Sequence, residues 1–291
     1  MSELKDKNLY YVGGVVRDEI LGVQSFDTDF CYEGDAISFA ENAGLNIIKR
    51  NPDFGTVRVL FDGKEIDIAS TRKETYPQAG HLPEVTDIGC ELKEDLKRRD
   101  FTINALAKNT LTGEISDYFN GLEDLKSKTL RVLHDNSFID DPTRIIRALK
   151  FSVRFDFDLD EKTKKLQEEY LNNINYDMSY HRVKKELIET FNLNNSEAFD
   201  KFIKDGIYKL LGKNQNAPKI SGKKIRDAIN NHKISNPWII YMGFFDLSKL
   251  ALTRKEKKII EWAEKLETQS PTNNTPMESI VIHTLKTGGD I

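Results

Sequence analysis

The sequence predicts an α+β protein in which an α/β head is followed by an all-helical neck and body. Three observations lead to this prediction. Strand and helix signals are mixed in the first part of the chain, helical periodicity dominates from Asp95 onward, and no internal repeat or low-complexity tract interrupts the pattern. We therefore expect the head at 1–135, the neck at 136–200 and the body at 201–291.

The head is expected to begin with a strand, a glycine turn and a helix. Asp62-Gly63 lies between two β-rich runs and predicts the clearest hairpin, because this dipeptide suits a two-residue turn. The segment 73–86 carries two prolines and a glycine, and we expect it to be a mobile loop. The expected elements are a strand over 9–12, a helix over 15–21, a strand over 26–32 and the hairpin over 56–70.

The remainder predicts amphipathic helices. The segment 137–155 has an acidic start, carries Pro142 in its first turn and then follows helical periodicity. Residues 269–276, QSPTNNTP, are expected to form a polar connector. Further helices are expected over 179–193, 222–232, 236–250 and 253–267.

Composition excludes several classes of protein. The 291 residues carry a formal net charge of −4, with 38% hydrophobic and 31% charged residues, which is ordinary for a globular chain. No run approaches the roughly 18 apolar residues of a membrane span. The N-terminal MSELKDKNLYY lacks an apolar signal region, so we expect a cytoplasmic protein with no membrane partner. Cys31 and Cys90 form no CxxC pair, which argues against a disulfide framework or a zinc site.

Two aspartates two residues apart distinguish the expected strand 26–32. Alternate residues of a strand share a face, so Asp27 and Asp29 project together and would repel each other unless a cation lies between them. Asp67 alternates with apolar neighbours and is our candidate for a third carboxylate, although Glu65 has the same orientation. Three carboxylates on adjacent strands can hold two Mg²⁺ ions for phosphoryl transfer. Solvated acids on an exposed strand are the alternative.

Gly13-Gly14 lies between the first strand and the first helix. Glycines there let backbone N–H groups meet a phosphate, and Arg17, one turn into the helix, would add a cation. The segment lacks the Gly-Lys-Ser/Thr of a P-loop and is no Rossmann fingerprint. Glycines alone are also typical of a tight turn, but their combination with Arg17 and the aspartates favours a nucleotide site.

Six motifs follow one another along the chain. They are GGVVRD at 13–18, DTD at 27–29, RRDFTINALA at 98–107, DYFNGLEDLKSKTLRVL at 117–133, DDPTRIIRALKF at 140–151 and HRVKKELIETF at 181–191. In this order they resemble the class II tRNA nucleotidyltransferase and bacterial poly(A) polymerase family. The resemblance implies a polymerase-β-like nucleotidyltransferase head and an enzyme that adds nucleotides to RNA 3′ ends without a nucleic-acid template.

The resemblance also implies roles for the matching residues. Asp27 and Asp29 would bind Mg²⁺, with Asp67 as the third acid. A charged turn before a buried helix is the alternative for 98–107. The expected nucleotide contacts of the head are Gly14 and Arg17 for the triphosphate, Arg99 and Asp100 for the sugar hydroxyls, and Asn104 as a brace.

The motif DDPTR resembles the family's protein template for choosing the base. Cytosine and adenine both present an exocyclic amine beside a ring-nitrogen acceptor, so Asp141 can accept from the amine while Arg144 donates to the ring nitrogen. Their i, i+3 spacing on a helix lets both address one base edge, whereas guanine and uracil reverse the order. An acidic helix start with an ion pair is the alternative. Arg147 matches a nucleotide-binding arginine, and Lys150 keeps the charge but loses the planar fork of an arginine.

The resemblance implies CTP and/or ATP and the tRNA 3′ end as substrates. Full or partial CCA addition to tRNA is our first hypothesis, poly(A) synthesis the second, and a catalytically idle RNA-binding relative the third. Members of the family usually continue into longer helical segments, so we expect an RNA-binding body that is short of a full tail. We expect His134-Asp135 to be a loop pair. Solvated helix faces are expected at Lys184, Lys185, Lys223 and Lys224, with RNA contact as the alternative.

Overall fold

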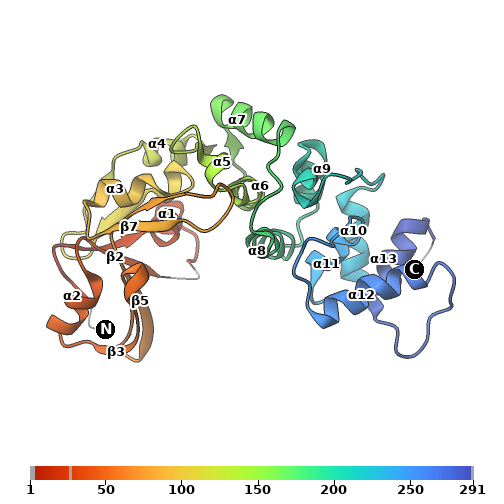
Figure 1. Ribbon diagram of the computed structural model, residues 1–291, viewed down its shortest axis with the longest axis horizontal. Helices are drawn as coiled ribbons and strands as arrows, with labels where there is room; N and C mark the ends of the chain where they lie inside the picture. Colours follow the sequence, from red (N-terminus) through yellow and green to blue (C-terminus); the bar gives the residue numbers. More distant parts are fainter. Residues whose placement is uncertain (1–3, 26–27, 290–291) are drawn as a thin grey trace. The chain divides into compact units, whose positions relative to one another are not determined.

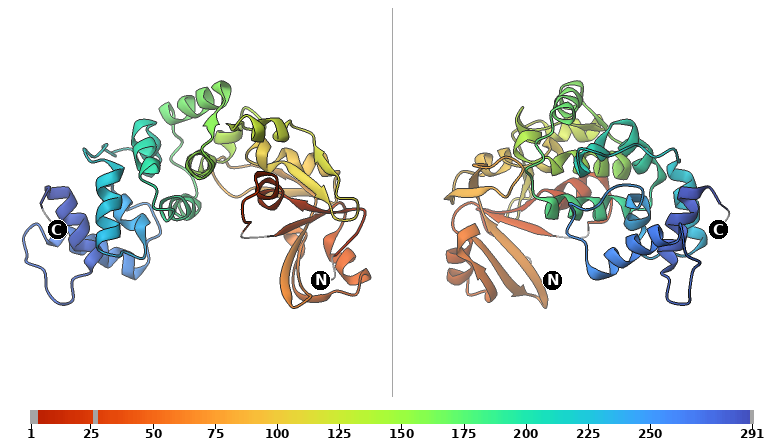
Figure 2. Two further views of the ribbon diagram at one scale, coloured as in Figure 1. Left: turned by 180° about the vertical axis from the view of Figure 1, so that it is seen from behind. Right: turned by 45° about the vertical axis from the view of Figure 1, so that its right-hand side comes forward.

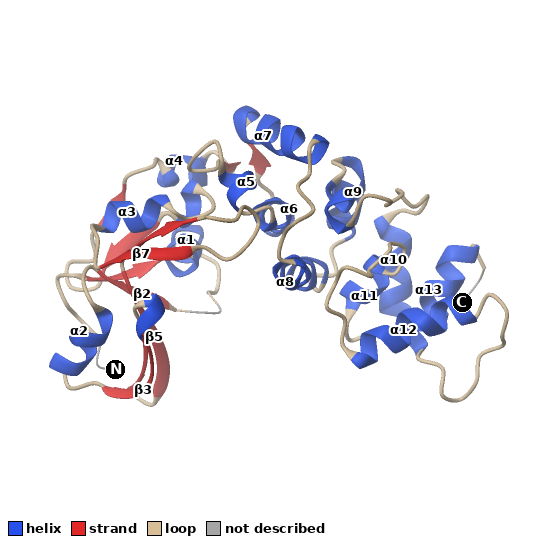
Figure 3. Cartoon of the chain, viewed as in Figure 1, coloured by secondary structure: helices blue, strands red, loops and turns tan. Residues whose placement is uncertain are grey.

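The computed structural model describes residues 4–25 and 28–289. The chain divides into two units. The first, which we call the head unit, comprises Met1–Asp140 and Asp158–Thr163, and the second, the helical unit, comprises Asp141–Phe157 and Lys164–Ile291. Figure 3 shows that strands gather in the head unit. The α+β prediction is therefore confirmed, while the limits of head, neck and body stay predictions.

The head unit is built on a seven-stranded sheet with the order β3-β4-β5-β2-β1-β8-β9. Strands β2 and β5 run parallel, and the other neighbouring pairs run antiparallel. The strands are β1 (Leu9–Val12), β2 (Asp29–Tyr32), β3 (Asn46–Asn51), β4 (Thr56–Phe61), β5 (Lys64–Ser70), β8 (Leu106–Asn109) and β9 (Ile115–Asp117).

Two smaller strand pairs and several short helices complete the head unit. The pairs are β6 (Arg72–Thr75) with β7 (Glu84–Ile88), and β10 (Thr129–Leu130) with β11 (Asp158–Leu159). The helices are α1 (Gly14–Leu21), α2 (Ala36–Asn42), α3 (Leu92–Lys97), α4 (Gly121–Lys126) and α5 (Ser137–Asp140), with the 3₁₀ turns η1 (Pro52–Phe54) and η2 (Thr102–Asn104).

The main sheet carries a hydrophobic core on each face. On one face α2 packs over β4 and β5 (Figure 1), and Phe30, Val57 and Ile68 are buried with it. On the other face Cys31 is buried with apolar residues of α3. Because neighbouring residues of a strand point to opposite faces, Asp29 lies on the same face as Cys31, the face that α3 covers.

The helical unit contains the remaining helices. They are α6 (Thr143–Phe155), α7 (Glu161–Asn172), α8 (Tyr180–Phe191), α9 (Ser196–Lys204), α10 (Gly222–Asn231), α11 (Pro237–Met242), α12 (Arg254–Lys265) and α13 (Met277–Thr287), with the 3₁₀ helix η3 (Ile207–Leu211). The start of α7, up to Thr163, belongs to the head unit. An aromatic cluster joins α8, α9 and α11, with ring centroids of Phe191 and Phe202 5.2 Å apart and those of Phe191 and Tyr241 5.3 Å apart. The predicted polar connector 269–276 loops away from α12 and α13 in both views of Figure 2.

The predicted hairpin is confirmed. Strands β4 and β5 flank Asp62 and Gly63, whose φ angles are 50° and 75°. The expected mobile loop over 73–86 is wrong at both of its ends, because β6 and β7 pair there with Lys73 opposite Asp87. The two prolines of the segment fall in the connection between these strands, where the ladder needs no N–H donor.

Four further predictions need correction. The strand expected over 26–32 begins only at Asp29, and Phe26 and Asp27 lie outside the described residues. The helix expected over 137–155 is split into α5 and α6, because Pro142 lacks an N–H and disfavours helical geometry at Asp141. The helix expected over 236–250 ends at Met242. Beyond Asp95, where we expected helices to dominate, β8 and β9 extend the sheet.

Candidate active site

Two carboxylates of the predicted site come from neighbouring strands, β2 and β5. These strands run parallel, and Asp29 is the direct partner of Asp67 in the ladder. Paired residues of neighbouring strands project to the same face, so the two exposed carboxylates lie beside each other. Glu65 shares this face but is paired with Leu60 of β4 instead. The ladder therefore favours Asp67 over Glu65 as the acid next to Asp29.

An arginine from β4 binds Asp67. The Nε and Nη2 atoms of Arg58 donate to the two carboxylate oxygens of Asp67, each at 2.8 Å. A hollow of about 150 Å³ lies at this point and is lined by both ladder aspartates and by Arg98 and Arg99. The exposed acids and the arginines of the RRD motif thus line one small cavity.

Gly13 forms the turn between β1 and α1. Its φ of 70° is unfavourable for residues other than glycine, and a Cβ at this position would lie only 2.9 Å from Nη1 of Arg99. The carbonyl of Gly13 accepts the first helical hydrogen bond from the Arg17 N–H at 3.1 Å. The glycine therefore lets the backbone turn into α1 while the Arg99 guanidinium lies against it.

Arg17 links α1 to the motif RRDFTINALA. Its guanidinium is buried and donates to Asp18 at 2.8 and 2.6 Å and to Asn104 at 2.5 Å. Asn104 in turn donates to Asp100 at 2.9 Å. Four side chains thus form one hydrogen-bonded chain, which joins the predicted phosphate cation to the predicted sugar-binding residue. The sequence analysis missed Asp18, although it follows Arg17 directly in the motif GGVVRD.

A buried acid organises the two arginines of the same motif. Asp95 accepts from Arg98 at 3.0 and 2.9 Å and from Arg99 at 3.2 Å, and Arg98 also donates to Glu74 at 3.0 Å. Burial opposes ionisation of Asp95, but Arg99 and Arg98 outweigh it, so the pKa of this carboxyl lies below its ordinary value. Within the described residues the buried Nε of Arg99 has no hydrogen-bond partner.

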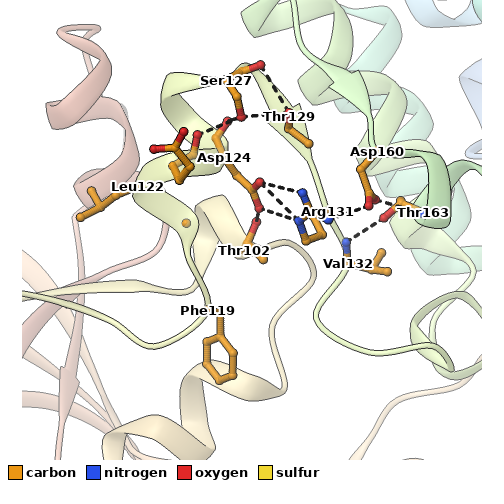
Figure 4. Close-up of polar contacts among 12 residues, drawn as sticks. Thr102, Phe119, Leu122, Asp124, Ser127, Thr129, Arg131, Val132, Asp160 and Thr163 are labelled. Carbon is orange, nitrogen blue, oxygen red and sulfur yellow. Dashed lines mark hydrogen bonds and ion pairs between the residues drawn. The ribbon is translucent and has the colours of Figure 1, made fainter.

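A second polar cluster supports η2, which carries Asn104 (Figure 4). Asp124 of α4 accepts from the Thr102 hydroxyl at 2.6 Å and from Nε of Arg131 at 3.1 Å. Arg131 also donates to Asp160 at 2.7 Å. These residues belong to the motif DYFNGLEDLKSKTLRVL or pair with it, so the motif holds the turn that carries Asn104.

The predicted base-choosing residues lie in the helical unit. Asp141 precedes α6 and is buried, with one oxygen accepting from the Thr143 N–H at 3.1 Å and the Thr143 hydroxyl at 2.6 Å. Its other oxygen accepts from Arg182 of α8 and lies 4.0 Å from Nε of the buried Arg144. We expected Asp141 to lie within the helix. It lies instead just before the helix, where these contacts fix its carboxylate.

Arg147 and Lys150 continue the same side of α6 toward α8. Arg147 pairs with Glu186 at 3.2 Å, and the Lys150 ammonium lies 2.8 Å from Glu186 and 2.6 Å from Glu189. Burial opposes ionisation of Glu189, but the hydrogen bond from Lys150 outweighs it and lowers its pKa. Lys150 thus joins two helices in this structure, and its predicted nucleotide contact stays a prediction.

Several charged residues to which the sequence analysis gave no catalytic role have ion-pair partners within the chain. Asp135 pairs with Lys162 at 2.5 Å, and His134 lies 3.9 Å from Asp140. Lys184 is buried and donates to Glu256 at 2.6 Å, so it joins α8 to α12 and does not form an exposed basic face. Within residues 4–25 and 28–289, no group of three or more metal-ligating side chains gathers, and no helix is long and apolar enough to cross a membrane.

Comparisons with known proteins agree with this arrangement. A model of the poly A polymerase head domain matches residues 9–131. An A-adding tRNA nucleotidyltransferase of Aquifex aeolicus (strain VF5) is 46% identical over 170 residues, which are 56% of this chain and 20% of that protein. The chain thus spans about a fifth of the length of this relative.

Solved structures are similar over nearly the whole chain. A CCA-adding enzyme in an apo form has a TM-score of 0.76 and 28% identity, with 94% of this chain and 74% of that chain covered. A tRNA nucleotidyltransferase complexed with a primer tRNA and an incoming ATP analog has a TM-score of 0.73 and 26% identity, with coverage of 96% and 91%.

The fold and the site define a protein with a polymerase-β-like nucleotidyltransferase head followed by a helical body. The chain is similar to poly(A) polymerases in its head and to A-adding and CCA-adding tRNA nucleotidyltransferases.

Proposed function

We propose that this chain is a tRNA nucleotidyltransferase that adds C, A or both to the tRNA 3′ end from CTP and ATP and releases pyrophosphate. The names of the relatives support the reaction class, and the A-adding name of the Aquifex relative favours A as the nucleotide added. A cytoplasmic location and Mg²⁺ as the metal are parts of the same proposal.

The observation that carries the proposal is the ladder pairing of Asp29 with Asp67. Carboxylate oxygens are the ligands that Mg²⁺ prefers, and these two acids lie side by side with exposed side chains. Asp29 and Asp67 would therefore hold the ion, together with Asp27 of the same D-T-D motif. When bound, Mg²⁺ would lower the pKa of the RNA 3′-hydroxyl and offset negative charge on the leaving pyrophosphate.

The other residues of the head would bind and orient the nucleotide. The turn at Gly13 and Gly14 offers backbone N–H groups at the start of α1, which favours a phosphate there. Arg17, held by Asp18 and Asn104, would contribute its positive charge to the same end of the nucleotide. Among the described residues the buried Nε of Arg99 has no partner, and this supports a nucleotide contact of Arg99, because a buried donor without a partner is costly unless a ligand uses it.

Base choice would rest on Asp141 and Arg144. Thr143 and Arg182 fix the Asp141 carboxylate, so its acceptor position is defined before a base arrives. Cytosine and adenine satisfy an acceptor beside a donor, whereas guanine and uracil leave both protein groups unpaired. Sites built around such hydrogen bonds reject a mismatch on the order of 10⁴-fold.

The test is incorporation of single nucleotides into three tRNAs, which end before CCA, after CC, and after the complete CCA. We expect ATP to extend the tRNA that ends in CC, in a reaction that stops when EDTA removes the metal. If CTP extends the shortest tRNA, the enzyme also adds C. Repeated ATP addition to the complete tRNA would identify a poly(A) polymerase, and no incorporation into any tRNA would refute the proposal.

A further inference from the structure

Four charged residues form a row across the exposed part of the head sheet. In the ladders, Lys49 of β3 is paired with Arg58 of β4, Arg58 with Asp67 of β5, and Asp67 with Asp29 of β2. Paired residues share a face, so two cations are followed by two carboxylates along one line. With strands about 4.8 Å apart, the row is about 14 Å long.

The cationic end of this row borders a groove. A hollow of about 330 Å³ lies there and is lined by Lys49, Arg50, Asn51, Thr56, Arg58 and Asp67. The smaller hollow at the carboxylates shares Thr56 and Asp67 with it. The groove therefore leads along the sheet directly to the proposed catalytic acids.

Exposed partners or none hold the two cations of the row. Within the described residues, the Lys49 side chain makes no ion pair or hydrogen bond, whereas Arg58 pairs with Asp67 at 2.8 Å and with Glu65 at 3.6 Å, and these three side chains are 45% to 60% exposed. Exposed ion pairs contribute little to stability, because solvent screens them and fixing two long side chains costs entropy. A polyanion can replace such a partner at small cost.

We propose that the cationic half of this row binds the sugar-phosphate backbone of the RNA strand that leads to the reacting 3′ end. This inference rests on the proposed function. The charges along the row define the direction of the strand: its phosphates lie along Lys49 and Arg58, and its terminal hydroxyl, which is uncharged, lies at Asp67 and Asp29. The reverse direction would place phosphates against two carboxylates, which repel them.

The test is binding of a fluorescently labelled tRNA ending in CC to the full chain, measured by anisotropy at several salt concentrations. The variant is Lys49→Ala, which leaves the proposed catalytic residues intact. Its matched control is Lys97→Ala, which removes one exposed charge from α3 of the same unit. Thermal unfolding of both variants checks that the fold is kept.

We expect the Kd of the groove variant to rise about threefold near physiological salt and the slope of log K against log salt to fall by about one, for the one lost phosphate contact. The control should retain both values. The KM for ATP at saturating tRNA should not change. An unchanged Kd and slope would overturn the proposal, and so would a raised KM for ATP with unchanged tRNA binding, because the groove would then hold the nucleotide's phosphates. Since binding is measured without turnover, a chain that binds tRNA but incorporates nothing would refute the proposed function alone.

Discussion

The two charged sites of the chain differ most in burial. In the head unit, the side chains of Asp67 and its partner Arg58 are 57% and 45% exposed. In the helical unit, the side chains of Asp141 and Arg144 are 6% and 4% exposed. Both sites combine an acid with an arginine. Only the exposed acid of the head unit can exchange its arginine for another partner at a small cost in free energy.

This difference matches the two tasks that we propose. An acid that binds a metal ion must release its resting partner, and an exposed ion pair is weak enough to allow this. A residue that chooses a base must penalise the wrong one, and the penalty of an unpaired group is large only where water cannot reach it. We therefore expect exposed carboxylates to control the rate and buried polar groups to control the choice of nucleotide.

The largest expected effect is that of Asp29→Asn. The change keeps the shape of the side chain but removes the charge beside Asp67, and we expect kcat for incorporation to fall about a thousandfold. Because Asp29 is exposed, the unfolding transition should not move. Asp62→Asn at the hairpin turn is the control, since asparagine tolerates its positive φ. Near-normal turnover of the Asp29 variant would show that this acid is not part of the catalytic site.

Arg144→Ala tests the other side of the comparison. We expect the preference for ATP over GTP, measured as a ratio of kcat/KM values, to fall about a hundredfold while some turnover with ATP persists. The reason is that guanine would no longer face a misplaced buried donor. Arg154→Ala, in the last turn of the same helix, should leave the ratio unchanged. If both variants kept the wild-type ratio, base choice would not depend on Arg144.

Local signals predicted much of this arrangement, and long-range pairing produced the rest. Asp62-Gly63 predicted the hairpin because the turn residues and both strands are adjacent in sequence. The same local argument failed for β8, which pairs with β1 at the start of the chain. It also failed for β6 and β7, because two prolines in the connection led us to expect a loop where the two strands form.

The residues of the site could be predicted from the sequence, but the contacts between its elements could not. The D-T-D spacing and the candidate Asp67 pointed to acids on neighbouring strands, but only the register shows that Asp29 faces Asp67 and that Glu65 does not. The contact of Arg182 with Asp141 joins residues 41 positions apart. The motif HRVKKELIETF contains this arginine, yet no spacing within one helix indicates what the side chain contacts on another.

Asp95→Asn tests how far a buried acid in the head supports the site. We expect the free energy of unfolding at neutral pH to fall by about 2 kcal/mol, because Arg98 and Arg99 lose a charged acceptor. The folded-state pKa of Asp95 is lowered, so its contribution is present above the ordinary value of 3.8 and disappears as the pH falls through the lowered pKa.

Urea unfolding of wild type and variant at neutral pH and at about pH 3 measures this dependence, and the difference between the two proteins should shrink at the lower pH. Asp87→Asn, which removes an exposed acid 3.8 Å from Lys73, should change stability little at either pH. A difference that stayed constant between the two conditions would mean that packing, not charge, accounts for the role of Asp95.

The smallest expected effect is that of Arg182→Met. Arg182 is a positioning residue, since it contacts Asp141 and would act on the base only through it. Thr143 still holds the other carboxylate oxygen at 2.6 Å in the variant, so we expect the ATP over GTP ratio to fall only about tenfold, less than in Arg144→Ala. Arg182→Lys should restore part of the ratio, because an ammonium can still donate to Asp141. Lys185→Met on the same helix is the control. A variant that lost stability but kept its selectivity would show that Arg182 supports the fold alone, and the buried site would then fix its acceptor through Thr143.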